Sequence, residues 1–221
     1  MIIAIDGPAA SGKGTLGRRL AQFYGLAYLD TGSLYRAVGL ALLRDQANAR
    51  ANANVNDGAG AGANTEAGDR DGIDEDRAVL LARHLDVATL DDVALRDEAT
   101  AAAASKVAAI PAVRTALLAF QRQFARQGAV LDGRDIGTVV CPDADVKLYV
   151  TASDAVRAQR RFDELSQKGV KTSLAAVLAD LKERDARDQA RTTAPLKQAK
   201  VAVLLDTTEL DIESAFARAG M

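Results

Sequence analysis

Residues 7–15 read Gly-Pro-Ala-Ala-Ser-Gly-Lys-Gly-Thr, and this segment constrains the chain more than any other. It follows the apolar run at residues 2–5 and precedes residues 13–23, whose apolar side chains recur at helical spacing. A glycine-rich loop between a buried strand and a helix turns backbone N–H groups toward one point, beside the positive end of the helix. The segment therefore predicts a phosphate-binding loop, and its flanking elements argue against a chance match in a chain rich in glycine and alanine.

The loop residues indicate how a nucleoside triphosphate and magnesium would be held. Gly7 and Gly12 allow the backbone to wrap tightly. Lys13 would reach the outer phosphates, while a nearby hydroxyl approaches the magnesium ion. The general pattern has Ser or Thr directly after the lysine, but here Gly14 comes first and Thr15 supplies the hydroxyl. The predicted triphosphate-binding residues are Gly7, Pro8, Ala9, Ala10, Ser11, Gly12, Lys13, Gly14 and Thr15.

Apolar runs alternate with helical patterns along most of the chain. We expect strands at residues 2–5, 26–29, 129–132, 146–150 and 201–205. We expect helices at residues 13–23, 31–43, 97–109, 111–128, 153–167 and 172–188, one from residue 74, and a last one after the final strand. This alternation predicts an α/β fold of three layers, a parallel sheet with helices on both faces, as in phosphate-loop NTPases.

The first helices and the segment after them carry local predictions. Leu16, Leu20 and Phe23 share one face of the first helix, which we expect to be buried. Thr31 is placed to cap the second helix with its side-chain oxygen. Residues 44–72 then lack any periodic apolar face, so we expect a mobile loop there and assign it no function.

Several polar residues directly follow the apolar runs. In parallel sheets, ligands bind beyond the carboxyl ends of the strands, so Asp6, Asp30, Asp132 and Thr151 should line one edge with the phosphate-binding loop. Asp132 has the position of the acid that holds magnesium through water in phosphate-loop enzymes. The alternative is a carboxylate that only ends its strand.

Arginine occurs at several places where a plain surface would more often carry lysine. The planar guanidinium group binds phosphate oxygens and base edges at two points. On the helix expected at residues 153–167, Arg157 shares a face with Arg160 or Arg161, so two positive charges could meet a transferring phosphoryl group together. Arg160 and Arg161 are equally compatible with a solvated surface. The other arginines singled out are Arg36, Arg114, Arg134, Arg184, Arg187 and Arg191.

Composition limits the other classes of function. The 221 residues suit one compact domain, and a formal net charge of −2 argues against a general nucleic-acid binder. The single cysteine, Cys141, excludes an intramolecular disulfide, and no apolar run reaches the length of a membrane span. We therefore expect a cytoplasmic protein that binds small molecules, not membranes or nucleic-acid polymers. No heptad or exposed repeat indicates assembly, so we expect a monomer, and we expect His84 to be structural.

The chain resembles the bacterial cytidylate kinases, which are nucleoside monophosphate kinases of the phosphate-loop class. The ending Gly-Lys-Gly-Thr is similar to that of adenylate-kinase-type enzymes. The segments that carry the resemblance are Ile-Asp-Gly-Pro at 5–8, Leu-Asp-Thr-Gly-Ser-Leu-Tyr-Arg at 29–36, Ala-Ser-Lys-Val-Ala at 104–108, residues 111–114, Asp-Gly-Arg-Asp-Ile-Gly-Thr at 132–138, and residues 183–196. These segments span nearly the whole chain.

The resemblance implies transfer of the terminal phosphoryl group of ATP to CMP and dCMP, with Mg²⁺. It implies that Thr31, Arg36 and Arg134 hold the acceptor phosphate. It also implies that the cytosine is bound by Ser105, Arg114, Asp135 and Arg191, and the sugar by Arg184 and Asp188. The residues expected to take part in catalysis are Lys13, Asp132, Arg134 and Arg157, and those expected at the metal are Thr15 and Asp132.

The same resemblance suggests a division of the domain. The core would comprise residues 1–36, 112–152 and 192–221, and the acceptor lobe residues 37–111. Residues 153–191 would form a helical lid that closes only with both nucleotides bound. The family has a small sheet insertion in the acceptor lobe, but here only residues 88–96 are available for it, so we expect a reduced lobe.

Two other functions remain open from the sequence. A kinase for another small acceptor, such as UMP or AMP, is the nearest alternative among enzymes. A non-catalytic ATP-binding regulator would need the phosphate-binding loop but not two sets of arginines. A GTPase is excluded because every asparagine lies between residues 48 and 64, where no guanine-reading motif occurs.

Overall fold

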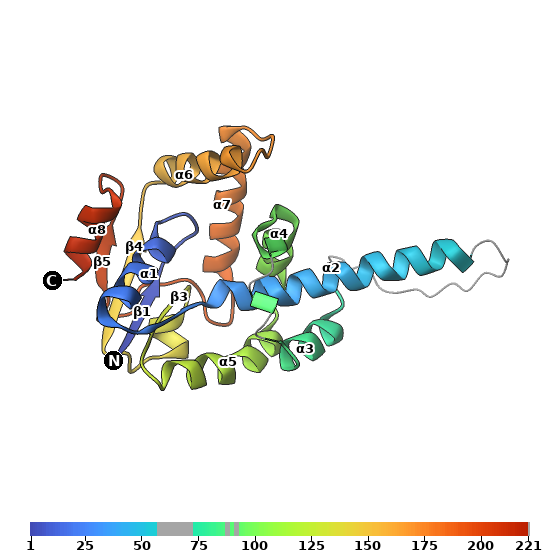
Figure 1. The fold of residues 1–221 in the computed structure, drawn as a ribbon, viewed down its shortest axis with the longest axis horizontal. Coiled ribbons are helices and arrows are strands. Elements are labelled where there is room, and N and C mark those ends of the chain that lie inside the picture. Colours follow the sequence, from blue (N-terminus) through green and yellow to red (C-terminus); the bar gives the residue numbers. More distant parts are fainter. Residues whose placement is uncertain (57–72, 87–88, 91–92, 221) are drawn as a thin grey trace. The chain divides into compact units, whose positions relative to one another are not determined.

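The computed structural model describes residues 1–56, 73–86, 89–90 and 93–220 (Figure 1). The chain divides into two compact units. Unit 1 comprises Met1–Thr31 and Leu118–Met221, and unit 2 comprises Gly32–Leu117.

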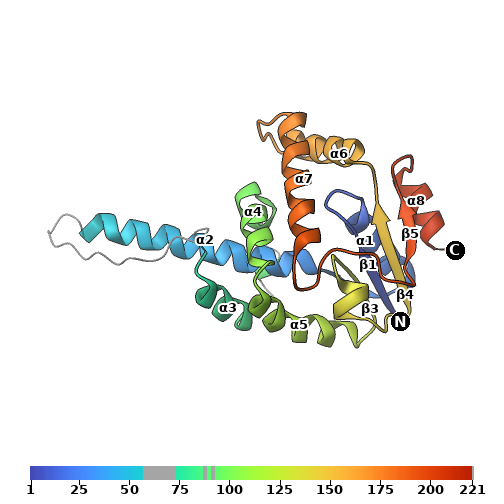
Figure 2. The same ribbon diagram turned by 180° about the vertical axis from the view of Figure 1, so that it is seen from behind.

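Unit 1 is built on a parallel sheet whose order is β2-β3-β1-β4-β5 (Figures 1 and 2). The strands are β1 (Ile2–Asp6), β2 (Ala27–Asp30), β3 (Ala129–Gly133), β4 (Val146–Thr151) and β5 (Val203–Asp206). The five predicted strands are confirmed, with ends that shift by one or two residues. The sheet carries helices on both sides, so the predicted α/β fold class is confirmed as well.

One face of this sheet packs against α1 (Lys13–Tyr24) and α8 (Ile212–Ala219). Alternate strand residues point to opposite faces, so Ile3 and Ile5 turn toward Leu16 and Leu20 of α1. Phe23 departs from the prediction, because 65% of its surface is exposed. It lies in the last turn of α1, where its ring meets the edge of Phe216 instead of the sheet.

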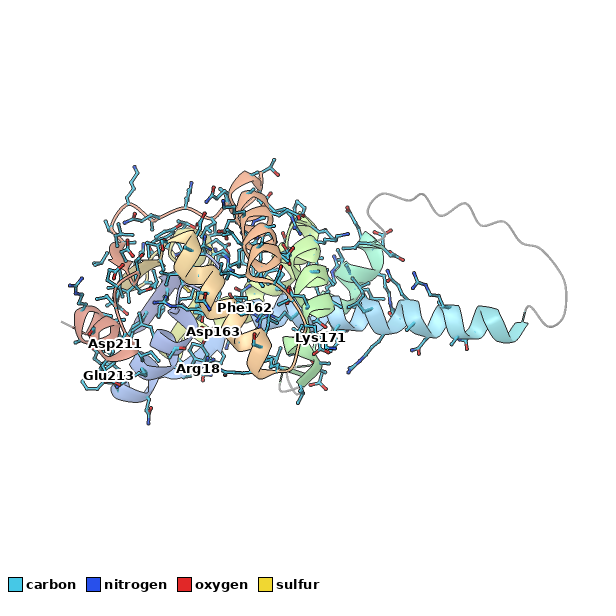
Figure 3. All side chains as sticks on the ribbon, turned by 90° about the horizontal axis from the view of Figure 1, so that it is seen from above. Arg18, Phe162, Asp163, Lys171, Asp211 and Glu213 are labelled. Carbon is cyan, nitrogen blue, oxygen red and sulfur yellow. The ribbon has the colours of Figure 1, made fainter. Side chains whose placement is uncertain are left out.

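The other face of β1 and β3 contacts η3 (Ile136–Val140), a single π-helical turn that follows β3. Beyond β4, α6 (Asp154–Gln167) and α7 (Leu174–Ala190) form a hairpin, and Figure 3 labels Phe162 and Asp163 on α6. The side chains of Ser153 and Ser173 cap the two helices.

Unit 2 contains most of α2 (Thr31–Asn56), then α3 (Glu75–Arg83), the short 3₁₀ turn η2 (Val93–Arg96), α4 (Glu98–Val107) and the first half of α5 (Pro111–Ala125). Helices α2 and α4 approach closely at Gly39, where a Cβ atom would lie 2.9 Å from the backbone nitrogen of Ala104. Arg77 of α3 is paired with Asp45 of α2 at 2.7 Å.

The loop predicted at residues 44–72 is wrong for its first part, because α2 continues through Asn56. Residues 47, 49, 51 and 53 are alanines, the best helix formers, and extending an existing helix avoids the cost of nucleation. The lack of an apolar face that suggested a loop is compatible with a helix whose residues 47–52 are exposed. Residues 57–72 lie outside the described part of the chain.

The described residues of unit 2 contain no strand, and η2 lies within the short segment at residues 88–96 where we expected a reduced lobe. Within the described ranges, no single helix is long and apolar enough to cross a membrane. Among these residues, α4 and α5 together have the length and composition of a membrane span, but the two helices are bent by 100° relative to each other.

Candidate active site

The phosphate-binding loop is held tightly against the sheet. A Cβ atom at Gly7 would lie 2.0 Å from the carbonyl oxygen of Val150 in β4, so only glycine fits. Gly12 has a φ of 88° at the start of α1, and Ala10 has a φ of 58°, an unusual conformation for a residue other than glycine. The side chain of Ser11 is fully buried. The sequence placed this loop correctly between β1 and α1.

Lys13 and Asp132 meet beneath the loop, with 3.7 Å between Nζ and Oδ1. Both side chains are nearly buried. Burial lowers the pKa of Lys13 to about 8, with a further contribution from the charge of Arg134. Burial also raises the pKa of Asp132, although the charge of Lys13 acts in the opposite direction. For both groups, therefore, the loss of water outweighs the attraction across 3.7 Å.

Tyr28 is a member of this group that the sequence did not identify. Its hydroxyl donates a hydrogen bond of 2.6 Å to Asp132 Oδ2. Strands β2 and β3 are neighbours, with Tyr28 opposite Val130 and Asp30 opposite Asp132. Burial is the main reason that the pKa of Tyr28 is raised, so the hydroxyl remains a donor. The sequence signal for this residue was a tyrosine two residues before Asp30, the acid that ends β2.

The segment after β3 is fixed by bonds from two neighbouring strands. Thr31, predicted as the cap of α2, is the first residue of that helix and donates from Oγ1 to the carbonyl oxygen of Asp132 at 2.8 Å. A Cβ atom at Gly133 would lie 2.6 Å from that hydroxyl, so glycine is needed there. The carboxylate of Asp6, at the end of β1, accepts from the backbone N–H groups of Ile136 and Gly137 at 2.7 and 2.8 Å. The turn that carries Arg134 and the buried Asp135 is therefore tied to the start of the phosphate-binding loop.

Arg134 lies against the C-terminal part of α7. Its Nε donates to Asp188 Oδ2 at 2.9 Å, and Arg191 Nη1 lies 3.8 Å from Asp188 Oδ1. Burial alone would raise the pKa of Asp188, but the charges of Arg134, Arg191 and Arg184 lower it below its usual value. In this part of the site, the predicted residues Arg134, Arg184 and Arg191 thus surround the ionised carboxylate of Asp188, which was also predicted.

The arginines of α6 do not converge as predicted. Arg157 is buried and bonds to Asp154 and Asp185 at 2.6 Å, and it also donates to the carbonyl oxygen of Ala9 at 3.1 Å. Arg160 and Arg161 turn to other partners, Thr207 and Glu164 respectively. Although helical spacing puts these residues on one side of α6, each guanidinium group donates to a different acceptor. Arg157 fastens the α6–α7 hairpin to the phosphate-binding loop.

A cavity of about 510 Å³ opens beside the loop, between α1, α6 and the start of α8. Figure 3 shows Asp211 and Glu213 at this end of α8. The sequence did not identify this cavity, although the segment after β5 lies at the same sheet edge as the loop. Its volume is in the range of small-molecule and cofactor pockets. The lining includes Thr15, Leu16, Arg160, Thr207, Leu210 and Ile212.

Three predicted site residues belong to unit 2. Ser105 is buried on α4, and Arg114 is buried on α5. The Arg114 guanidinium lies 5.4 Å from the centre of the Tyr35 ring and donates to the carbonyl oxygen of Ala108. Arg36 lies on α2 and is partly exposed. Among the described residues, no group of three or more His, Cys, Asp or Glu side chains is placed to hold a metal ion.

Comparisons with known proteins agree with this geometry. The family model for cytidylate kinase matches residues 3–219. The chain is 56% identical over 221 residues to the cytidylate kinase of Azorhizobium caulinodans, covering 99% of this chain and 96% of the relative. It is 56% identical over 221 residues to that of Xanthobacter autotrophicus, covering 99% and 95%, and 53% identical over 218 residues to that of Methylocella silvestris, covering 98% and 90%.

Among solved structures, an uncharacterized protein from Eubacterium ventriosum aligns with a TM-score of 0.52 at 12% identity, covering 99% of this chain and 94% of the other. That likeness concerns the fold alone. The family model and the full-length relatives decide the classification: the chain belongs to the cytidylate kinase family.

Proposed function

We propose that the protein transfers the terminal phosphoryl group of ATP to CMP and dCMP. One observation carries this proposal beyond family membership. The phosphate-binding loop and the turn that carries Arg134 follow neighbouring strands, β1 and β3, with Asp6 opposite Gly133. A triphosphate site and a guanidinium group for a second phosphate therefore share one sheet edge, which is what transfer between two nucleotides requires.

The donor side would bind ATP. The loop from Gly7 to Thr15 would hold the phosphates, with Lys13 at the outer ones. The cavity between α1 and α8 would take the rest of the nucleotide, and Arg160 lines it. Because the cavity adjoins Gly12 and Thr15, a single ligand can occupy both loop and cavity.

The oxygen donors near the loop fit Mg²⁺. A single buried carboxylate beside hydroxyl groups suits an ion that keeps several waters and takes its other ligands from phosphate oxygens. Asp132 would hold the ion through water, and Thr15 would supply a hydroxyl from the start of α1. The bound ion would neutralise part of the triphosphate charge.

The acceptor side would bind CMP. Arg134, Arg36 and Thr31 would hold its phosphate. The residues that would contact the cytosine are Ser105, Arg114, Asp135 and Arg191, and those that would contact the sugar are Arg184 and Asp188. Ser105 and Asp135 would accept from the exocyclic amine that uracil lacks. A buried acceptor left without this partner would disfavour UMP by about 1 to 3 kcal/mol.

The chemistry needs placement more than acid–base catalysis. The acceptor phosphate oxygen is already a nucleophile, so the protein has to align it, neutralise charge and exclude water. Lys13 and Arg134 would stabilise the transferred group from the donor and acceptor sides. Arg157 would act mainly through its bonds to Asp185 and Ala9, which hold the α6–α7 hairpin near the loop.

Residues 153–191 would close as a lid when both nucleotides are bound. Two helices that turn at Gly169, where φ is 74°, can move as one body. Hydrogen exchange of α6 and α7 should slow with a non-hydrolysable ATP analogue plus CMP, and much less with either alone. Exchange that does not respond to the pair of nucleotides would contradict the lid. We also propose that the protein acts in the cytoplasm as a monomer on these small molecules.

Turnover with ATP and a panel of monophosphates tests the function and its alternatives. We expect CMP and dCMP to be phosphorylated well ahead of UMP and AMP. A preference for UMP or AMP would contradict the specificity, and binding of ATP without any turnover would favour a regulator.

Arg134→Ala tests the acceptor side separately. It should lower kcat/KM for CMP by about 10²-fold or more, because it removes a charge that stabilises the transferred group. ATP affinity, measured by calorimetry, should stay nearly unchanged. An equal loss of ATP affinity would mean that Arg134 belongs to the donor side.

A further inference from the structure

Gly14 leaves an opening directed at the carboxylate of Asp132. A Cβ atom at residue 14 would lie 3.2 Å from Asp132 Oδ2 and 3.5 Å from the Tyr28 hydroxyl oxygen. Phosphate-binding loops of the general pattern place a Ser or Thr hydroxyl at this position, where it reaches the magnesium ion. The next hydroxyl in this chain, that of Thr15, belongs to a residue lining the cavity toward α8. Residue 14 is therefore the one that faces the acid.

The Tyr28 hydroxyl occupies the region that a side chain at residue 14 would enter. It arrives from β2, across the sheet from the loop, and bonds to Asp132 Oδ2 at 2.6 Å. The ring passes α1 at Gly17, where a Cβ atom would lie only 2.9 Å from Tyr28 Cε2. The Arg18 guanidinium, on the same helix, lies 5.4 Å from the ring centre, and Figure 3 labels this side chain. Glycine at residues 14 and 17 thus clears a path for one phenol.

The hydrogen bond from Tyr28 also fixes the orientation of the Asp132 carboxylate. With Oδ2 held by Tyr28, Oδ1 is the oxygen that faces Lys13 Nζ at 3.7 Å. A carboxylate buried to this degree has few ways to be oriented except through such a donor. Outer donors of this kind fix the ligands of metal ions in many sites.

We propose that the Tyr28 hydroxyl, which reaches from β2 into the space beside Gly14, positions Asp132 to receive the hydrated magnesium ion of the donor nucleotide. Tyr28 is a positioning residue in this account, because it acts through Asp132. The inference rests on the proposed metal role of Asp132, and it assigns a specific purpose to Gly14 and Gly17.

The test is the gain in nucleotide affinity that Mg²⁺ provides. Calorimetry on the full chain would measure binding of a non-hydrolysable ATP analogue with EDTA and then with Mg²⁺. For Tyr28→Phe we expect unchanged affinity in EDTA and a Mg²⁺-dependent gain reduced about tenfold, the usual size for one hydrogen bond to a charged group. Tyr24→Phe, which removes a hydroxyl from a tyrosine at the exposed end of α1, is the matched control and should keep the full gain.

Rescue separates positioning from general damage. Gly14→Ser combined with Tyr28→Phe restores a hydroxyl beside Asp132, so the Mg²⁺-dependent gain should return. Tyr28→Phe with an undiminished gain would overturn the proposal, and so would a double variant no better than Tyr28→Phe alone.

Asp132→Asn and wild-type turnover of CMP distinguish the two levels of failure. If Asp132→Asn abolishes the Mg²⁺-dependent gain while Tyr28→Phe leaves it intact, Tyr28 is not the positioning residue but the metal role of Asp132 stands. If neither variant changes the gain while the wild type phosphorylates CMP, the metal role of Asp132 fails and the inference fails with it.

Discussion

Two buried carboxylates of unit 1, Asp132 and Asp188, have pKa values that are shifted in opposite directions. Burial raises the pKa of Asp132, which is paired with Lys13 at 3.7 Å. The pKa of Asp188 is lowered in spite of its burial, because Arg134 bonds to it at 2.9 Å and Arg191 lies at 3.8 Å. Similar burial with different partners therefore shifts the two pKa values in opposite directions.

The difference indicates how each side of the site would use its ligand. On the proposed donor side, Lys13 and Asp132 compensate each other poorly, so phosphates and a cation would gain by binding between them. On the proposed acceptor side, Arg134 is already paired with Asp188, so an incoming phosphate would have to share Arg134 with that carboxylate.

Loss of the donor-side cation should have the largest effect. Lys13→Met keeps the length of the side chain but removes its charge, and we expect kcat to fall about 10³-fold, as for other single electrostatic stabilisers. A coupled assay with ATP and CMP measures this. Lys168→Met on the α6–α7 hairpin, where Lys168 pairs with Glu164, is the control and should retain activity. A loss below about tenfold for Lys13→Met would contradict the assigned role.

The stability of the two carboxylate variants tests the comparison directly. Asp188→Asn removes the charge that compensates Arg134 and Arg191, so we expect about 3 kcal/mol less free energy of unfolding. Asp132→Asn replaces a carboxylate that burial already disfavours, so its cost at pH 7 without nucleotide should be clearly smaller. Urea unfolding followed by circular dichroism measures both. Equal costs would abolish the distinction between the two sides.

Asp6 extends the comparison to a carboxylate held only by N–H groups. Burial raises its pKa from 3.8 to about 6, although its bonds to Ile136 and Gly137 oppose this. Because Asp6 holds its proton up to a higher pH in the folded state than in the unfolded state, protonation of Asp6 stabilises the fold. This contribution to the free energy of unfolding is fully present below about pH 4 and is lost as pH rises through about 6.

The expected size of this effect is on the order of 2 kcal/mol. Between pH 4 and pH 7, the free energy of unfolding measured in urea should therefore fall by this amount in the wild type, and Asp6→Asn should lack this fall. Asp180→Asn on α7 provides a control, which should follow the wild type. An identical pH dependence for Asp6→Asn and wild type would mean that Asp6 does not titrate in this range.

The sequence sufficed wherever function follows from chain order. A strand, a glycine-rich loop and a helix in succession locate Lys13, and the rule for parallel sheets brings Asp132 to the same edge. The pairing of Asp188 with Arg134 joins residues 54 positions apart in the chain, so it required the fold.

The errors have physical causes. The arginines of α6 share a helical face, but their long side chains reach acceptors in several directions. Arg160 donates to Thr207, which follows β5, and so does not meet Arg157 as predicted. Tyr28 was overlooked because its role depends on the space left by glycines on another element. The alanine-rich part of α2 is helical, against the predicted loop, because the helix propensity of alanine outweighs the lack of an apolar face.

Phosphorus NMR of the purified protein with ATP, Mg²⁺ and CMP would follow phosphoryl transfer itself. We expect ATP and CMP to be consumed together and ADP and CDP to appear in equal amounts. We also expect little inorganic phosphate while CMP remains, because closure of the proposed lid would exclude water. Release of inorganic phosphate without CDP, or no change in the ATP signals, would contradict the proposed function.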